Sequence, residues 1–366
     1  NAKQAALVTG IDVFPVENLK SLFLHLKKEK IIKPIDRSSI KNISRNHKNT
    51  PTIDDIYGQE QAKRAIQIAV AGRHNILLSG PPGSGKTMLA KSLKNLLPTL
   101  SEDEIVEVTK LHSLGEHTII NNPVVDRPFR SPHHTASRAS IIGGGSKVQP
   151  GEISLAHRGV LFLDELLEYP RTVLESLRQP LEDHEITVSR ANGKFNFPAN
   201  FLLVATMNPC PCGFLGDPEK TCICSQNQIL NYQKRLSGPL LDRIDLTVSV
   251  SRVPHEKLLN NKVSTKSQQE TFLSEIHKAY SIQRDRYKCS YKYNNDIPSS
   301  NVDKITSISE SAKTFLTNAA KKLDLSTRSY FKVIKVSRTI ADLEGSAYIE
   351  IPHIAESLQY RQISIG

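Results

Sequence analysis

The sequence has no tryptophan, two methionines and only 6% aromatic residues in 366 positions. It also lacks a long apolar run, because no stretch approaches the roughly 18 apolar residues that a membrane-spanning helix needs. No charged and then apolar secretory leader opens the chain. With 38% hydrophobic and 23% charged residues, the composition is typical of globular proteins and argues against a disordered or membrane-embedded chain. We therefore expect a soluble folded protein in the cytoplasm, with no membrane partner.

Acidic residues are fewer than basic ones. Lysine and arginine contribute 48 residues against 37 from aspartate and glutamate, which gives a formal net charge of +11 and an isoelectric point near 9.3. Such a balance favours polyanionic partners, nucleic acid first and anionic lipid second, although it says nothing about the fold. The length allows two or three domains of roughly 100 to 200 residues each.

The N-terminal part of the chain holds too little apolar sequence for a domain. Its pattern predicts a short strand over residues 6–8 and an amphipathic helix that begins at Asn18. Because the chain starts at Asn1 and runs straight into this pattern, we expect residues 1–32 to be the remnant of a truncated N-terminal domain. Residues 33–52 are basic and lack periodicity, so they predict a flexible linker.

Short apolar runs then alternate with helical patterns. The runs predict buried strands at 75–78, 106–108, 160–163, 201–205 and 246–250. Buried strands separated by helices are typical of a doubly wound, mostly parallel α/β sheet with helices on both faces. Farther along, helices are expected at 270–287, 308–323, 326–343 and 351–360, with a loop at 288–301. We therefore predict an α/β core over 53–253 and a small all-helical domain over 254–366.

A glycine-rich segment lies between the predicted strand 75–78 and a predicted helix 88–97. It fits G-x-x-x-x-G-K-[ST] and consists of Gly80, Pro81, Pro82, Gly83, Ser84, Gly85, Lys86 and Thr87. The glycines let backbone amides point at phosphate groups, Lys86 reaches the β and γ phosphates, and Thr87 ligates magnesium. The flanking strand and helix disfavour the alternative of a chance glycine loop. The segment predicts a binding site for ATP with Mg²⁺.

Two carboxylates follow the predicted strand 160–163. This arrangement places Asp164 on the magnesium ion and makes Glu165 the general base for the attacking water. Paired acids are also common as helix N-terminal charges, so the reading depends on the preceding phosphate loop. The strand 201–205 leads to Asn208, to which we assign contact with the water or the γ phosphate, although such an Asn is often a turn former. Together these residues predict ATP hydrolysis.

Several segments resemble one family of ATPases. They are residues 56–59, 127–134, 143–145, 150–157, 163–166, 208–213 and 238–245, with 326–328 and 336–343 near the C-terminus. Over nearly its whole length the chain is similar to the magnesium-chelatase-like AAA+ ATPases of the ComM (YifB) family. The resemblance implies an AAA+ core, a C-terminal helical lid, and an N-terminal remnant of a Lon-protease-like fold. It also implies that Tyr57 and Gly58 line the adenine pocket.

Two arginines gain roles from the same resemblance. Arg243 corresponds to the finger that reaches a neighbouring subunit's γ phosphate, and Arg328 corresponds to the sensor of the lid, with Arg338 as the alternative. The family works as rings, commonly hexamers, and a cation supplied by a neighbour would couple hydrolysis to assembly. For Arg243 a salt bridge with Asp242 or Asp245 remains the alternative.

Two elements point to DNA, single-stranded or branched. An Asn-Gly pair between alternating runs predicts a β-hairpin over 185–197, on which Arg190 and Lys194 would contact phosphates. In related helicases such a hairpin lines the central pore. The insert at 129–146, which includes Arg130, resembles a pore-facing insertion in the second helix of the fold. A solvated hairpin with ordinary basic residues is the alternative.

Four of the five cysteines form a C-x-C pair on each side of a nine-residue spacer, as Cys210, Cys212, Cys222 and Cys224. Four thiolates can enclose a tetrahedral Zn²⁺ and fix a loop that has little core of its own. The spacing is tighter than the usual C-x-x-C. Structural zinc, reduced thiols packed in a loop, and redox pairing therefore remain open.

These features predict an ATP-hydrolysing ring motor that acts on DNA. The resemblance implies helicase or branch-migration activity during recombination of incoming DNA in natural transformation. The alternative is a protein-remodelling ATPase subunit of the magnesium-chelatase type. A non-enzymatic nucleotide-binding module is disfavoured, because the residue types needed for turnover are all present.

Overall fold

The computed structural model describes residues 2–8, 10–35, 50–115, 122–145, 148–190, 193–253, 267–288 and 293–361. The side chains of Arg190, Asp303 and Lys304 lie outside this description. Most of the predicted linker, the start of the predicted helical domain, and Ala191 and Asn192 in the turn of the hairpin also lie outside it. No helix in the described ranges is both long enough and apolar enough to cross a membrane.

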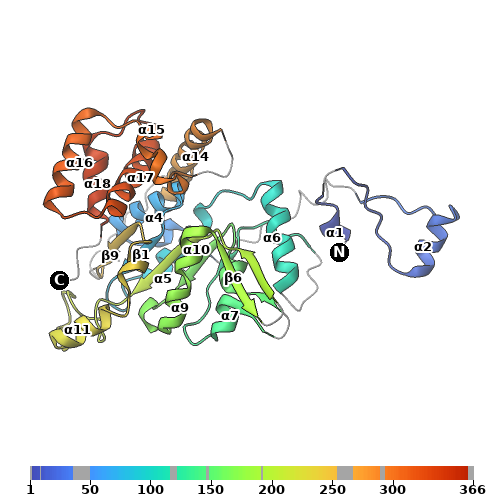
Figure 1. The fold of residues 1–366 in the computed structure, drawn as a ribbon, viewed down its shortest axis with the longest axis horizontal. Helices are drawn as coiled ribbons and strands as arrows, with labels where there is room; N and C mark the ends of the chain where they lie inside the picture. The colour runs from blue at the N-terminus through green and yellow to red at the C-terminus, as the bar shows by residue number, and fades with distance from the viewer. Residues whose placement is uncertain are drawn as a thin grey trace.

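A parallel sheet forms the centre of the fold (Figure 1). Its strands are β1 (Ile76–Ser79), β2 (Phe129–Arg130), β5 (Val160–Leu163), β8 (Leu202–Met207) and β9 (Leu246–Ser249), in the order β2-β5-β8-β1-β9. Every neighbouring pair is parallel, and Leu163 lies beside Ala205 while Leu78 lies beside Thr206. The carboxyl ends of the strands therefore meet at one edge of the sheet, where the phosphate loop and the paired carboxylates begin.

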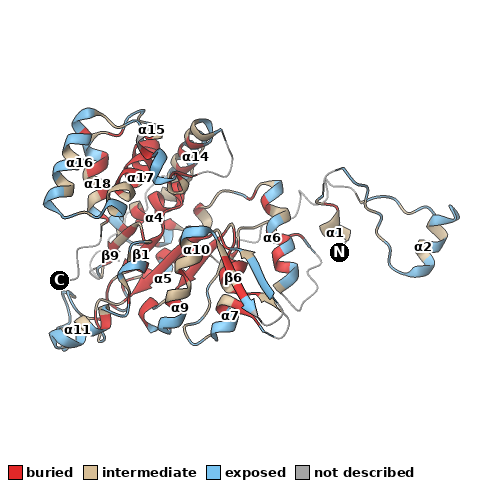
Figure 2. Ribbon diagram, viewed as in Figure 1, coloured by how far each residue is buried: buried red, intermediate tan, exposed pale blue. Residues whose placement is uncertain are grey.

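Both faces of the sheet are covered, because the apolar strand residues alternate between two cores. Ile76 and Leu78 belong to one core, and Leu77 belongs to the other. The first core includes residues of α4 (Glu60–Gly72), α5 (Lys86–Ser92), α14 (Gln268–Tyr287) and α17 (Thr327–Glu344). The second includes residues of α7 (Arg138–Ile142), α8 (Glu152–Leu155), α9 (Arg171–Ser176), α11 (Gln226–Gln233) and α12 (Gly238–Leu241). Figure 2 shows the buried residues gathered in the sheet and in the helix faces turned toward it. The doubly wound α/β prediction is confirmed.

The C-terminal region is helical, as predicted. Its elements are α14, α15 (Val302–Ile305), α16 (Glu310–Lys322), α17 and α18 (Ile351–Gln359). Residues of α15, α16, α17 and α18 form a separate core. The interpretation of 288–301 as a loop is wrong in part. Its described end contains the short helices η4 (Asn294–Asp296) and η5 (Ser299–Asn301), and Asn294 is fully buried. The Asn294 side chain donates to Thr339 and Asp342 of α17, so tertiary contacts order a segment of low-complexity sequence.

The predicted hairpin is confirmed as β6 (Glu185–Arg190) paired with β7 (Gly193–Pro198), next to α10 (Arg178–Asp183). A second antiparallel pair joins β3 (Gly143–Gly144) to β4 (Gln149–Pro150). The remaining elements are α1 (Ala2–Ala5), α2 (Leu19–Leu26), η1 (Ile53–Asp55), η2 (Leu93–Leu96), α6 (Glu102–Gly115) and η3 (Leu166–Glu168). In Figure 1, α1 and α2 lie to one side of the sheet and its helices.

Two strand predictions are wrong, and three strands of two residues each, β2, β3 and β4, were missed. Residues 6–8 continue the turn of α1, because the amide of Ala6 donates to the carbonyl of Ala2. Residues 106–108 lie inside α6, where Ser101 and Glu104 exchange capping hydrogen bonds that start a helix. Strand β2 has two residues and no apolar run, so periodicity had no signal for it.

Candidate nucleotide-binding site

The phosphate loop (residues 80–87) connects the end of β1 to α5 and needs glycine at three positions. Gly83 and Gly85 have φ of +78° and +87°, which L side chains rarely adopt. A Cβ on Gly80 would lie 2.1 Å from the carbonyl oxygen of Val250 at the end of β9. The backbone of the turn and the neighbouring strand end therefore require glycine at the positions where the motif has it.

Lys86 begins α5 and is 9% exposed. Its Nζ donates to the carbonyl oxygens of Gly80 (2.6 Å) and Pro81 (2.8 Å) and lies 3.4 Å from Oδ1 of Asn208. Burial lowers the pKa of Lys86, while the carboxylates of Asp164 and Glu165 oppose this effect. The ammonium group is thus held by its own loop, at the place where a triphosphate would supply stronger acceptors.

Asp164 follows β5 and faces Thr87 across the sheet edge. The hydroxyl of Thr87 donates to Oδ2 of Asp164 (3.2 Å), and the hydroxyl of Thr206 in β8 donates to Oδ1. A hydroxyl and a carboxylate are the oxygen ligands that Mg²⁺ takes beside nucleotide phosphates. The predicted pair of Thr87 and Asp164 therefore lies together and fits this ion.

Glu165 adopts a left-handed backbone conformation, with φ of +53°, at the end of β5. Its amide donates to the hydroxyl of Thr206 (3.0 Å), so Thr206 orients both members of the carboxylate pair. The Glu165 side chain is 54% exposed, and its Oε2 lies 3.7 Å from Nδ1 of His134. An exposed carboxylate beside a residue that could hold magnesium is able to accept a proton from water.

Tyr57 and Gly58 lie before α4 and close to the segment that follows β9. Tyr57 is 48% exposed, and Gly58 has φ of +62° and would contact Val253 through a Cβ at 3.6 Å. The side chain of Gln59 donates to the carbonyl oxygens of Ser84 and Ser251. This segment is therefore fastened to the phosphate loop and to the strand β9 beside it.

Arg243 and Arg328 share one carboxylate. Both guanidinium groups pair with Glu182 of α10, and Nη2 of Arg328 lies 2.6 Å from Oε1. Arg243 also donates to the carbonyl oxygens of Pro239 and Arg178. Burial raises the pKa of Glu182, but the two arginines outweigh it and lower the value below its ordinary range. Arg243 has neither Asp242 nor Asp245 among its salt-bridge partners in the described residues.

This arginine pair lies away from the phosphate loop of the same chain. The carbonyl of Arg243 accepts a hydrogen bond from Nδ2 of Asn75 (2.9 Å), which directly precedes β1. The phosphate loop follows the other end of β1, and four residues at about 3.3 Å each separate the two ends by about 13 Å. Arg243 and Arg328 therefore lie together near the opposite edge of the sheet.

The two lid arginines differ in environment. Arg338 is 1% exposed and pairs with Asp342 at 3.0 Å within α17. The side chain of Arg328, at the start of the same helix, is 45% exposed. Only Arg328 of the two is therefore accessible to a ligand.

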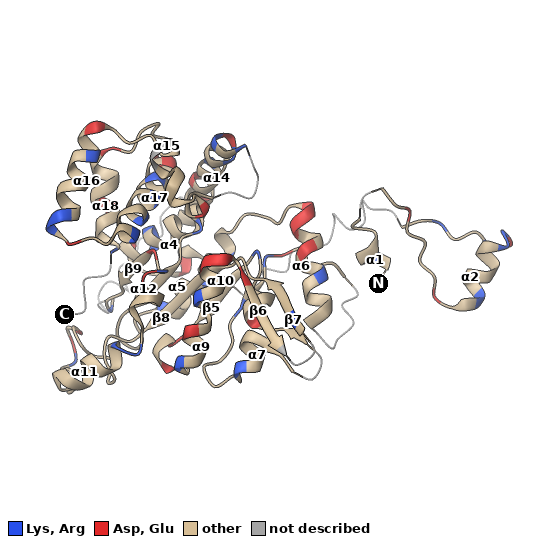
Figure 3. Cartoon of the chain, in the orientation of Figure 1, with Lys and Arg blue, Asp and Glu red and all other residues tan. Residues whose placement is uncertain are grey.

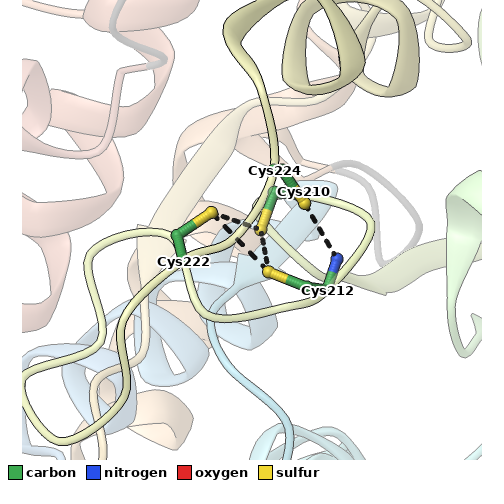
Figure 4. Close-up of side chains that lie close together, drawn as sticks. All are labelled: Cys210, Cys212, Cys222 and Cys224. Atoms are coloured by element: carbon green, nitrogen blue, oxygen red, sulfur yellow. Dashed lines mark hydrogen bonds between the residues drawn. The ribbon is translucent and has the colours of Figure 1, made fainter.

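The four clustered cysteines converge, although they come from both ends of a loop (Figure 4). Their Sγ atoms all lie within 4.8 Å of one another, and Sγ of Cys210 is 3.4 Å from that of Cys212 and 3.6 Å from that of Cys222. Four sulfurs around Zn²⁺ at about 2.3 Å are about 3.8 Å apart, whereas a disulfide needs about 2.05 Å. Hydrogen bonds from backbone N–H groups, of which that of Phe214 has the largest effect, lower the pKa of the Cys212 thiol to about 6. The cluster fits a tetrahedral zinc ion.

The predicted DNA contacts are in different environments. Lys194 lies on the exposed strand β7. Arg130 lies on β2, and its guanidinium makes two hydrogen bonds to Glu152, at 2.6 and 2.7 Å. The side chain of Arg190 lies outside the described part of the structure. In the described ranges, lysine and arginine are spread over many elements and do not gather on one of them (Figure 3).

Sequence reasoning missed three residues of this site. Thr206 had a signal, a hydroxyl residue in an otherwise apolar strand two positions before Asn208. Glu182 and the position of His134 beside Glu165 had none, because only the tertiary structure brings these residues to their partners.

Comparison with known proteins shows extensive similarity. The family model of magnesium chelatase subunit ChlI matches residues 52–258, and the model of the C-terminal part of that subunit matches 266–361. Competence protein ComM of Haemophilus influenzae is 43% identical over 99% of this chain and 70% of its own length. The YifB protein of Salmonella typhimurium is 37% identical, and an uncharacterized protein of Mycobacterium tuberculosis is 38% identical. Each of these two matches covers 99% of this chain, with 70% and 71% of the relative's length.

Proposed function

Since the chain belongs to the magnesium-chelatase family of AAA+ proteins, together with its ComM and YifB relatives, we propose that it is an ATP-hydrolysing ring motor that acts on DNA. The meeting of Lys86, Thr87 and Asp164 at one sheet edge, with Glu165 beside them, is the observation that supports hydrolysis most directly. Lys86 and the amides of the phosphate loop would bind the β and γ phosphates. Thr87 and Asp164 would hold Mg²⁺, which neutralises developing phosphate charge when bound.

Within this site Glu165 would accept a proton from the attacking water, and Asn208 would orient the water or the γ phosphate. Tyr57 and Gly58 would cover the adenine. These assignments follow from position: Asn208 contacts Lys86, and the Tyr57 segment is fastened to the phosphate loop through Gln59. These contacts support the proposed roles.

The remoteness of Arg243 and Arg328 from their own phosphate loop supports assembly. A guanidinium near the opposite edge of the sheet cannot stabilise the γ phosphate of its own chain. It can do so for a neighbour in a ring, commonly a hexamer in this family, where two cations would act on one phosphate. We propose that both arginines leave Glu182 and bind that phosphate when subunits assemble.

DNA is proposed as the substrate on three grounds. The chain carries a net charge of +11, the exposed strand β7 of the hairpin presents Lys194, and one relative is named a competence protein. Arg190, which pairs in register with Gly193 on the same hairpin, would contact the same strand. Arg130 is held by Glu152 and is therefore the weakest of the three predicted contacts. Strand movement or branch migration during recombination of incoming DNA, in the cytoplasm, would be the outcome.

Hydrolysis of ATP by the purified chain, with and without single-stranded and branched DNA at several salt concentrations, tests this proposal. We expect stimulation that fades as salt rises, and a salt slope of DNA binding that falls by about 1 to 2 in the double variant Arg190→Ala/Lys194→Ala. The matched control removes the charges of Lys321 and Lys322 at the end of α16 and should leave the slope unchanged. Hydrolysis by assembled rings that ignores every DNA would refute the proposal.

The second candidate is a protein-remodelling subunit of a metal chelatase. The match to the chelatase subunit model over more than half of the chain favours it. A protein client predicts hydrolysis that responds to that client and ignores DNA, so the same assay separates the two.

Structural zinc is proposed for the four clustered cysteines. Their sulfur separations fit a tetrahedral ion, and the backbone N–H groups directed at Cys212 favour its thiolate form. Elemental analysis of protein purified without added metal should give one zinc per chain, and the Cys212→Ser/Cys222→Ser variant should give none. Intact protein without zinc would leave packed thiols or redox pairing as the alternatives.

A further inference from the structure

The segment between the clustered cysteines (the cysteine loop, residues 210–224) packs directly against the phosphate loop. A Cβ on Gly213 would lie 2.6 Å from Cδ and 2.8 Å from Cγ of Pro82. The Gly213 backbone therefore touches the Pro82 ring so closely that any side chain would displace one of the two loops. Since proline has a fixed φ, pressure on its ring acts on the phosphate loop backbone.

A second connection runs through Arg252, which follows β9. Its Nη2 donates to the carbonyl oxygen of Pro82 (3.1 Å), and its Nη1 donates to Oε2 of Glu219 (3.2 Å). Its Nε lies 3.1 Å from Oδ2 of Asp217, whose side chain is fully buried. A planar guanidinium can hold several partners in fixed directions. One arginine thus joins two acidic residues of the cysteine loop to the phosphate loop.

The cysteine loop also begins beside the lysine of the phosphate loop. Asn208 lies two residues before Cys210 and its Oδ1 is 3.4 Å from Nζ of Lys86. A Cβ on Gly213 would come within 3.9 Å of the Asn208 side chain. Movement of the cysteine loop would therefore shift both Asn208 and Pro82.

The cysteine loop has little apolar core with which to hold its own shape. Ile223 is 86% exposed and Leu215 is 38% exposed, whereas Cys210 is fully buried. A segment of this kind is ordered mainly by the ion that its ligands enclose. Its rigidity would then depend on the four sulfurs.

We propose that the cysteine loop is a support for the phosphate loop, so that metal bound by the four cysteines raises the affinity for ATP. Gly213 and Arg252 are the positioning residues that transmit this effect to Pro82. A phosphate loop held in its binding conformation loses less entropy when ATP binds. The inference rests on the proposed zinc site for its metal dependence, whereas the contacts with Pro82 stand independently of it.

Two glycines of the cysteine loop provide a matched test. Gly213 and Gly216 have φ of +84° and +77°, so Gly→Ala imposes a similar backbone strain at both. A Cβ on Gly213 meets Pro82, whereas a Cβ on Gly216 meets nothing within 4 Å. We expect the Kd of the full chain for N-methylanthraniloyl-ATP to rise about tenfold in Gly213→Ala and to stay within about twofold in Gly216→Ala. Equal Kd values in the two variants would refute the proposed effect of the contact between Gly213 and Pro82 on ATP binding.

Removal of the metal tests whether zinc bound by the four cysteines raises the affinity for ATP. After a zinc-selective chelator has stripped the protein, we expect a higher KM for ATP with little change in kcat at saturating ATP, and recovery when Zn²⁺ is returned. Arg252→Met should raise the Kd in the same direction and serves if Gly213→Ala does not fold. Zinc that is present but whose removal leaves the KM for ATP unchanged would overturn the inference while keeping the zinc site. A protein without zinc would overturn the site and the metal dependence together.

Discussion

Substitution of each lid arginine by methionine should separate a structural residue from a functional one. Arg338 is buried and donates to Asp342 and to the carbonyl oxygens of three residues, Thr306, Ser346 and Ala347. Removal of one member of a buried ion pair usually costs about 3–5 kcal/mol. Because Asp342 keeps its hydrogen bonds from Arg286 and Asn294, we expect the lower end, about 3 kcal/mol.

The exposed pair of Arg328 with Glu182 should contribute at most about 1 kcal/mol to stability. At a slope of about 2 kcal/mol per molar urea, Arg338→Met should lower the unfolding midpoint by about 1.5 M and Arg328→Met by less than about 0.5 M. Under native conditions, ATP turnover should fall more in Arg328→Met than in Arg338→Met. Arg328→Met removes a proposed γ-phosphate contact and leaves the fold intact. An unchanged midpoint in Arg338→Met, or equal loss in both variants, would refute the reasoning.

Three further outcomes are expected. Glu165→Gln should keep its Kd for ATP and lose about 10²–10⁴-fold in turnover, measured by phosphate release, and retained turnover would remove Glu165 from the role of base. Arg243→Ala and Lys86→Ala should each be inactive as pure rings but should regain turnover when mixed, because the mixture contains interfaces with both residues intact; no recovery in verified mixed rings would argue against action between subunits. Burial lowers the pKa of His74 to about 4, so its neutral form is favoured in the folded chain. An unfolded histidine takes up its proton near pH 6.5, so this stabilisation is complete above pH 6.5 and falls by up to about 3 kcal/mol as the pH drops to 4. Urea midpoints at pH 7 and 5 should therefore differ less in His74→Gln than in the parent chain, and equal differences would exclude His74 as the cause.

Local sequence predicted most of the fold where a pattern repeats. The apolar runs of β1, β5, β8 and β9 and the helices α14, α16, α17 and α18 are long enough for periodicity to identify. The pattern failed where a helix cap and burial outweigh it. Residues 106–108 are a strand by composition, yet the cap at Ser101 and the buried face of α6 make them helical.

The site shows the same division. The phosphate loop and the pair of Asp164 and Glu165 were predictable, because steric needs of backbone and phosphate chemistry specify residue types at fixed spacing. Glu182, which holds both arginines, was not predictable, since nothing in its own segment marks it. Long-range pairs of this kind leave no periodic signal in one sequence.

By itself, the sequence determined the chemistry that is available: a lysine and a threonine after glycines, two acids after a strand, and four cysteines in close spacing. It also determined the parallel sheet, since buried strands alternating with helices have few other arrangements. Only the tertiary structure decided which groups meet. It joined Thr206 to Asp164, separated the arginines from their own phosphate loop by the length of β1, and set Gly213 against Pro82. The physical reason is that residue type and spacing act within one segment, whereas these contacts arise when the packing of both sheet faces brings distant segments together.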